Sequence, residues 1–284
     1  MIRAYYQLTK PGIIYGNAVT FAAGFFLAAK GHISWTTFFY ALFGLSLVIA
    51  CGCVFNNYLD RKIDAQMQRT KQRVLVTGEI SSRSAIIFGT VLGLIGIFLL
   101  GFFVNALTLA IALTGALVYL VFYGVAKRRT IYGPLVGSIS GAVPPVVGYT
   151  AITNRFDLGA AILFFILVFW QMPHFYSIAI YRLDDYIHAG IPVLPSKKGI
   201  KRTKIEILAY IVLFLGAIGT LHFLHYAGKV YLIFAGLLSI SWLVFALKGF
   251  SPETVDKTWA RKMFFFSLFV LTGISILLAI NSLV

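Results

Sequence analysis

Nine apolar runs dominate this chain of 284 residues, and each is close to the roughly 20 residues that a helix needs to cross a bilayer. The chain is 60% hydrophobic and only 12% charged. Backbone groups in lipid must be hydrogen-bonded within the protein, which favours helices. We therefore predict an all-α polytopic integral membrane protein with spans at about residues 11–29, 35–57, 84–103, 106–124, 131–151, 158–180, 205–224, 229–248 and 262–282.

The polar segments between these runs are too short for a separate soluble domain. The two longest, at residues 59–83 and 181–204, have only about 25 residues each. We therefore predict a single membrane domain over residues 1–284, with these two segments as cytoplasmic active-site loops. The first apolar run is too long for a signal peptide, so we expect it to remain as the first span.

The basic residues predict the orientation, because loops rich in Lys and Arg are retained on the cytoplasmic side. With the N-terminus inside, all but three of the 24 Lys and Arg residues fall on the inner face; the exceptions are Lys30, Arg155 and Lys229. We expect a cytoplasmic N-terminus, an external C-terminus and a place in a bacterial inner membrane. The net charge of +15 then reflects retention and attraction to membrane lipid. Spread over short loops, it does not predict binding to nucleic acid.

The acidic residues are few, and they gather where two apolar runs end. Asn57, Asp60 and Asp64 stand at i, i+3 and i+7, on one helical face. Asp185 follows the sixth run, which ends on the same predicted side of the membrane. Hard cations such as Mg²⁺ bind one or two carboxylates together with water and substrate phosphate oxygens. The alternative is that these acids pair with Arg61, Lys62 and Arg182 at solvated helix ends.

Several motifs resemble one known family over nearly the whole chain, from Thr9 to Lys262. The Asp-rich segment and the basic stretch after it resemble the first motif of the UbiA superfamily of intramembrane prenyltransferases, and a Tyr/Lys motif follows the fourth span. Three further stretches resemble the protohaem IX farnesyltransferase branch. These segments lie at residues 56–64, 69–78, 123–128, 141–148, 170–174 and 185–195.

The chain departs from the superfamily pattern at two places. Asn57 replaces an acid in the first motif, and the second Asp-rich motif is reduced to Asp185, with Asp184 adjacent. Both departures resemble the haem branch. Fewer carboxylates make one Mg²⁺ ion easier to hold than two.

The resemblance implies a fold and a reaction. The expected fold is nine helices around a central cavity. The expected reaction transfers a farnesyl group from farnesyl diphosphate to the 2-vinyl group of haem b, with addition of water, giving haem O and diphosphate. A terminal oxidase or a haem A synthase would receive the product. Two alternatives are a prenyltransferase for a quinone precursor or another aromatic acceptor, and a transporter.

The resemblance and the charge pattern together suggest roles for individual residues. As catalytic residues we expect Asp60, Asp64, Asp185 and Lys127, and as Mg²⁺ ligands Asn57, Asp60, Asp64 and Asp185. As substrate-binding residues we expect Asn56, Asn57, Arg69, Arg73, Tyr123, Tyr181, Arg182 and His174.

His174 and the cysteines have alternative interpretations. In a continuous helix His174 shares a face with Tyr181 and Asp185, which would place it deep in the cavity that Asp185 borders. It then either binds or orients haem or is hydrogen-bonded across helices as a structural residue. Cys51 and Cys53 are most simply packing residues within the second span.

Overall fold

The computed structural model of the protein describes residues 1–281, and all regular secondary structure over that range is helical. Nine stretches there are long and apolar enough to cross a membrane, which confirms the predicted all-α polytopic fold. The elements are α1 (Ile2–Leu8), α2 (Pro11–Ala29), α3 (Trp35–Asp64), α4 (Ser82–Phe103), α5 (Ala106–Leu117), the π-helical turn η1 (Val118–Tyr123), α6 (Gly124–Arg129), α7 (Gly133–Gly141), α8 (Val143–Thr153), α9 (Leu158–Tyr181), α10 (Leu183–His188), α11 (Leu194–Phe223), α12 (Lys229–Leu247), the 3-10 turn η2 (Lys248–Phe250) and α13 (Asp256–Asn281).

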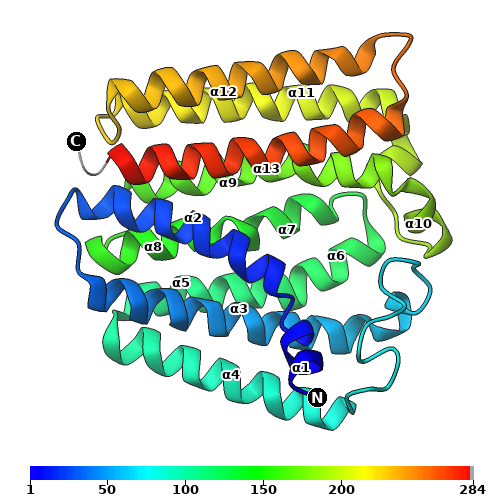
Figure 1. The fold of residues 1–284 in the computed structure, drawn as a ribbon, viewed down its shortest axis with the longest axis horizontal. Helices are drawn as coiled ribbons and strands as arrows, with labels where there is room; N and C mark the ends of the chain where they lie inside the picture. The colour runs from blue at the N-terminus through cyan, green and yellow to red at the C-terminus, as the bar shows by residue number, and fades with distance from the viewer. Residues whose placement is uncertain (282–284) are drawn as a thin grey trace.

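The spans run antiparallel to one another along the chain (Figure 1). The N-terminal helix α1, the loop between α3 and α4, and helix α10 all lie at one end of the bundle, whereas α13 finishes at the opposite end. We call the end that carries α1 and α10 the loop end. Both acid-bearing segments therefore emerge on the same side of the molecule.

Helix boundaries differ from the prediction where polar residues continue a helix beyond its apolar run. Helix α3 extends to Asp64, and α11 begins at Leu194 rather than near residue 205. Pro195 lies in the first turn of α11, where proline favours a helix start. Gly199 bends this helix with a φ of 81°. Much of the second predicted loop is therefore helical.

Helices α2 and α8 pack at very short range because glycine stands at their contact points. A Cβ atom on Gly24 would lie 2.0 Å from the carbonyl oxygen of Pro145, and one on Gly148 would lie 2.1 Å from that of Phe21. Small residues let membrane helices approach closely and gain packing energy. This contact places α2, and with it the turn at Lys10, against the rest of the bundle.

We predict that Gly148→Ala destabilises the protein, because the new methyl group meets the backbone of α2 and not a flexible side chain. Overpacking of this kind costs about 1–3 kcal/mol, so the thermal unfolding midpoint in detergent should fall by several degrees. The matched control is Gly236→Ala in α12, where a Cβ atom has no neighbour within 4 Å. Equal midpoints for the two variants would contradict this account of the α2–α8 contact.

Candidate active site

One cavity of about 530 Å³ opens inside the bundle. Its charged lining comes from the last turns of α3, the loop after α3, α6 and the turn at Lys10, all towards the loop end. Away from this end the lining is mostly apolar and includes Leu45 and Val48 of α3 and Val143 of α8. The cavity therefore has a charged mouth and an apolar interior.

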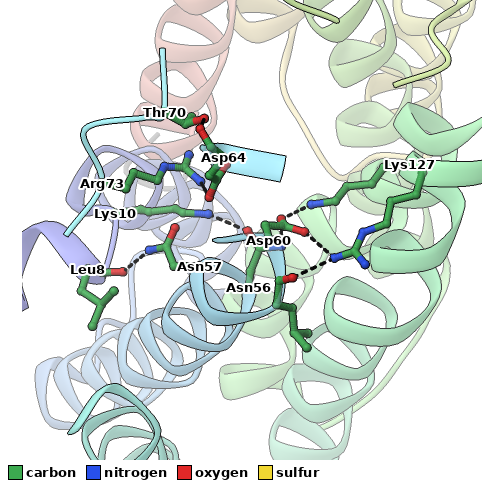
Figure 2. Close-up of polar contacts among 11 residues, drawn as sticks. Leu8, Lys10, Asn56, Asn57, Asp60, Asp64, Thr70, Arg73 and Lys127 are labelled. Carbon is green, nitrogen blue, oxygen red and sulfur yellow. Dashed lines mark hydrogen bonds and ion pairs between the residues drawn. The ribbon is translucent and has the colours of Figure 1, made fainter. Parts of the chain in front are cut away.

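Asp60 lies at the centre of the charged mouth (Figure 2). It is 4% exposed and forms ion pairs with Lys127 and with Arg128, whose guanidinium nitrogen is 2.7 Å from Oδ1. Asn56 donates from Nδ2 to Asp60 Oδ2 at 2.8 Å. The carboxylate thus joins α3 to α6 across the cavity mouth.

Asp64 is held by the loop that follows α3. Arg73 lies 2.6 Å from its carboxylate, and Thr70 donates from its hydroxyl to the Asp64 carbonyl at 2.9 Å. The loop is packed, since Met67, Val74, Leu75 and Ile80 are all buried. Arg69 and Arg73 both line the cavity, and this packing fixes the backbone that carries them.

The acids are not paired as the solvated-end alternative requires. Asp60 and Asp64 are buried, and their partners come from α6 and from the α3–α4 loop instead of from Arg61 and Lys62. That alternative is therefore wrong for these two residues. It holds in a weak form for Asp185, whose carboxylate lies 4.0 Å from Arg182.

Asn56, rather than Asn57, shares the cavity face with Asp60 and Asp64. Asn57 points towards α1, where its Nδ2 donates to the Leu8 carbonyl at 2.8 Å. Its Oδ1 atom is buried without a hydrogen-bond partner among the described residues. The predicted spacing is compatible with one face, but packing of α1 against that face takes Asn57 out of the cavity lining.

Asp185, Tyr181 and Arg182 do not line the cavity. Helix α9 ends at Tyr181, and Arg182 has non-helical angles of −111° and 21° before α10 begins. The face that His174 was expected to share with Asp185 is therefore interrupted, and this expectation is corrected. Tyr186, the next residue, lines the cavity instead, and burial raises its pKa.

Lys10 is a cavity residue that the sequence did not single out. It adopts a left-handed conformation, with a φ of 54°, between α1 and α2, and Pro11 then begins α2. Its ammonium group donates to Asn56 Oδ1 at 2.6 Å. Burial lowers the pKa of Lys10 to about 8, and Arg73 and Lys127 act in the same direction.

Tyr119, Tyr123 and Lys127 form one stripe along η1 and α6 that lines the cavity. The two tyrosine rings stack with centroids 5.7 Å apart, and the Lys127 ammonium group lies 5.4 Å from the centroid of the Tyr123 ring. Gly137 leaves room for that ring. Tyr119 was missed, although its i, i+4 spacing to Tyr123 is a signal that could have identified it.

The interior of the cavity includes Trp170, Gln171 and His174 from α9. His174 is hydrogen-bonded through Nδ1 to Ser267 Oγ at 2.8 Å, so the expected cross-helix bond is present while the residue also lines the cavity. Cys53 lines the cavity too, whereas Cys51 packs against Gly93 of α4.

The oxygen donors at the mouth supply only part of the coordination shell that Mg²⁺ needs. Asp60 and Asp64 supply carboxylate oxygens of the kind that hard cations prefer, and the unpartnered Asn57 Oδ1 lies on the same helix. Among residues 1–281, however, no cluster of three or more acids, histidines or cysteines surrounds one point. The site suits an ion that takes its remaining ligands from water and from a phosphate-bearing substrate.

Four cations and two carboxylates line the described cavity, which leaves an excess of positive charge for an anion. The cations are Lys10, Arg69, Arg73 and Lys127, and the carboxylates are Asp60 and Asp64. A diphosphate group matches this balance, and an apolar chain attached to it would enter the interior.

Comparisons with known proteins agree with this geometry. Residues 17–269 match the UbiA prenyltransferase family. The protoheme IX farnesyltransferase of Protochlamydia amoebophila is 51% identical over 276 residues, which is 97% of each chain. The enzyme of the same name from Cronobacter sakazakii is 49% identical and covers 100% of this chain and 96% of its own.

Solved structures share the fold at low sequence identity. A digeranylgeranylglyceryl phosphate synthase has a TM-score of 0.82 at 20% identity, covering 99% of this chain and 98% of its own. A UbiA homolog from Archaeoglobus fulgidus bound to GPP and Mg²⁺ has a TM-score of 0.67 at 15% identity, covering 97% and 99%. The chain therefore belongs to the UbiA prenyltransferase family and, within it, to the group of the protoheme IX farnesyltransferases.

Proposed function

We propose that this prenyltransferase moves the farnesyl group of farnesyl diphosphate to the 2-vinyl group of haem b, with addition of water, giving haem O and diphosphate. The observation that carries the transfer chemistry is the charged mouth above an apolar interior in one cavity. The choice of haem as acceptor rests on the relatives named protoheme IX farnesyltransferase.

The basic residues of the mouth would hold the diphosphate. In the structure Lys127 and Arg73 are paired with Asp60 and Asp64, so arrival of an anion lets these cations turn to the phosphate oxygens. Negative charge grows on the diphosphate as the allylic C–O bond breaks, and fixed cations stabilise that charge in the transition state. Arg69 and Lys10 line the same mouth and add to this stabilisation.

Asp60 and Asp64 would hold Mg²⁺, assisted by the neutral oxygen of Asn56, which lines the cavity with them, whereas Asn57 does not. The ion, when bound, supplies further charge stabilisation to the leaving diphosphate. Asp185 lies outside the cavity lining, so we assign it no direct ligand role.

The apolar interior would receive the farnesyl chain. The whole cavity, mouth and interior together, has a volume of about 530 Å³, which lies within the range of small-molecule sites. The walls of the interior include aromatic rings from Tyr119, Trp170 and Phe175. A water-poor wall protects an allylic cation from premature capture. Haem would approach the same interior, with its reacting vinyl group near the farnesyl C1 atom.

The distribution of Lys and Arg residues supports one orientation of the protein in the membrane. We propose that the loop end faces the cytoplasm of a bacterial inner membrane, where it has direct access to soluble diphosphate and Mg²⁺. The N-terminus would then be cytoplasmic and the C-terminus external. Transfer of the product to a terminal oxidase or a haem A synthase stays a prediction.

The direct test is to incubate the purified protein with Mg²⁺, farnesyl diphosphate and haem b and to analyse the extracted porphyrins by mass spectrometry. We expect haem O, its loss on chelation of Mg²⁺, and no prenylated product from 4-hydroxybenzoate. If the phenolic acid were prenylated and haem were left unmodified, the assignment to the prenyltransferase family would stand, but haem as the acceptor substrate would be wrong.

Asp60→Asn should reduce turnover at least about 100-fold, because loss of the Mg²⁺ that Asp60 would hold removes a group that stabilises transition-state charge. The amide keeps the shape but loses the charge that holds a cation. The control is Asp184→Asn on α10. The exposed carboxylate of Asp184 lies 3.5 Å from Lys257, and Asp184 does not line the cavity. Near-normal turnover of Asp60→Asn at limiting Mg²⁺ would contradict the metal assignment.

Arg73→Ala and Lys127→Ala should chiefly weaken use of farnesyl diphosphate. A charge-assisted hydrogen bond contributes roughly 1.5–3 kcal/mol, which corresponds to about a 10- to 150-fold rise in KM for the diphosphate substrate. Steady-state kinetics in nanodiscs measure this effect. Arg202→Ala provides the control, because Arg202 pairs with Glu206 on the exposed surface. An equal loss in the control would indicate a general effect of surface charge.

A further inference from the structure

The apolar interior of the cavity contains two hydrogen-bond acceptors on one wall. Gln171 and His174 both line the cavity, and residues three apart on a helix are neighbours, with Cβ atoms about 5–6 Å apart. Leu167, Leu268 and Leu271 also line the cavity. An acceptor atom of this pair that the protein leaves without a donor can receive a hydrogen bond from a molecule in the cavity.

The orientation of the Gln171 amide follows from its partners. Its Nε2 atom donates to the carbonyls of Leu167, at 3.1 Å, and Ser138, at 3.3 Å. Carbonyl oxygens only accept hydrogen bonds, so the nitrogen must face them and Oε1 must point the other way. A Cβ atom on Gly141 would lie 2.0 Å from Oε1. Any larger residue at position 141 would collide with Oε1, so glycine leaves the space that this oxygen occupies. Oε1 has no hydrogen-bond donor among the described residues.

The tautomer of His174 follows in the same way. Ser267 donates its hydroxyl hydrogen to the Phe264 carbonyl at 2.6 Å, so its oxygen is left to accept. The hydrogen bond of 2.8 Å between Ser267 Oγ and His174 Nδ1 must then be donated by Nδ1–H. A neutral imidazole with hydrogen on Nδ1 has its lone pair on Nε2, which has no partner in the described part of the chain.

The imidazole ring is held in a fixed orientation. Its centroid lies 4.8 Å from that of Trp170, with a 25° angle between the planes, and 4.9 Å from that of Phe264. Trp170 in turn donates from Nε1 to the Ser267 carbonyl at 2.8 Å. Ring packing and the Ser267 bond together fix the direction of Nε2, as a catalytic base requires.

We infer that His174 Nε2 and Gln171 Oε1 bind the water molecule that adds to the prenylated vinyl group, with His174 as its general base. The inference deepens the proposed function and rests on it. Two acceptors take the two hydrogens of one water, which leaves the oxygen lone pairs directed at the substrate. His174 and Gln171 are then catalytic residues, because both contact the reacting water, and Ser267 is a positioning residue that acts through His174.

The bonds balance without any further reactant. The C1–O bond of farnesyl diphosphate breaks, and its electron pair leaves with the diphosphate. The vinyl π electrons form a new bond between the terminal vinyl carbon and C1, which leaves a cation on the carbon next to the macrocycle. Water oxygen forms a bond to that carbon, and its proton passes to His174 Nε2. If no base is placed to take this proton, the cation can instead lose one from the neighbouring CH₂ group to an oxygen of the released diphosphate, which gives an alkene.

The test compares products and not rates alone. The full-length protein in nanodiscs is supplied with Mg²⁺, farnesyl diphosphate and haem b in water labelled with heavy oxygen, and the porphyrins are analysed by mass spectrometry. His174→Phe keeps an aromatic ring beside Trp170 but has no base. We expect it to release diphosphate and to raise the ratio of alkene, lighter by one water and unlabelled, to labelled haem O by about 100-fold. For Gln171→Met we expect a smaller rise, up to about 10-fold.

The matched control is His222→Phe. His222 lies at the end of α11, bonds to the Ala227 carbonyl at 2.8 Å and does not line the cavity, so its product ratio should equal that of the wild type. Labelled haem O as the sole product of His174→Phe would overturn the inference. So would loss of haem binding by His174→Phe with an altered haem spectrum, which would identify an iron ligand. Failure of the wild-type protein to prenylate haem would remove the proposed function itself, and the inference with it.

Discussion

The buried carboxylate of Asp60, held between Lys127 and Arg128, is the interaction on which the rest of the site depends. A charge removed from water must be paired, and here the partners come from a helix on the far side of the cavity mouth. The pairing therefore fixes α3 relative to α6. It also holds the Lys127 ammonium group beside the place where a diphosphate would bind. Substrate binding would then replace the ion pair with Asp60 by contacts to phosphate oxygens.

The interior is built by small residues as much as by large ones. Gly24 and Gly148 let α2 approach α8, Gly137 makes room for the Tyr123 ring, and Gly141 makes room for the Gln171 amide. Of these glycines, Gly137 and Gly141 line the cavity. The positions of the Tyr123 ring and the Gln171 amide in the cavity wall thus depend on the absence of a Cβ atom on the neighbouring helix.

The cavity separates two chemical requirements of prenyl transfer. Ionisation of a diphosphate needs concentrated positive charge, which the mouth provides through residues such as Lys127 and Arg73. The allylic cation needs the opposite environment, an interior with little water. The neutral acceptors Gln171 and His174 add one specific water position to that interior without adding charge.

The number of spans, the helical fold and the presence of acids at one end could be read from the sequence, because transfer of residues into lipid depends on local composition. The family motifs identified Asp60, Asp64, Arg73 and Lys127, all of which line the cavity. Four features of the site could not be predicted in that way. Asn56 lines the cavity instead of Asn57, Asp185 lies outside the lining, Lys10 lies within it, and Asp60 pairs with Arg128. Each depends on which helix packs against which face, or on a single turn such as that at Arg182. Hydrophobic periodicity sets a helix and its length, whereas the contacts between helices decide which of its polar side chains meet.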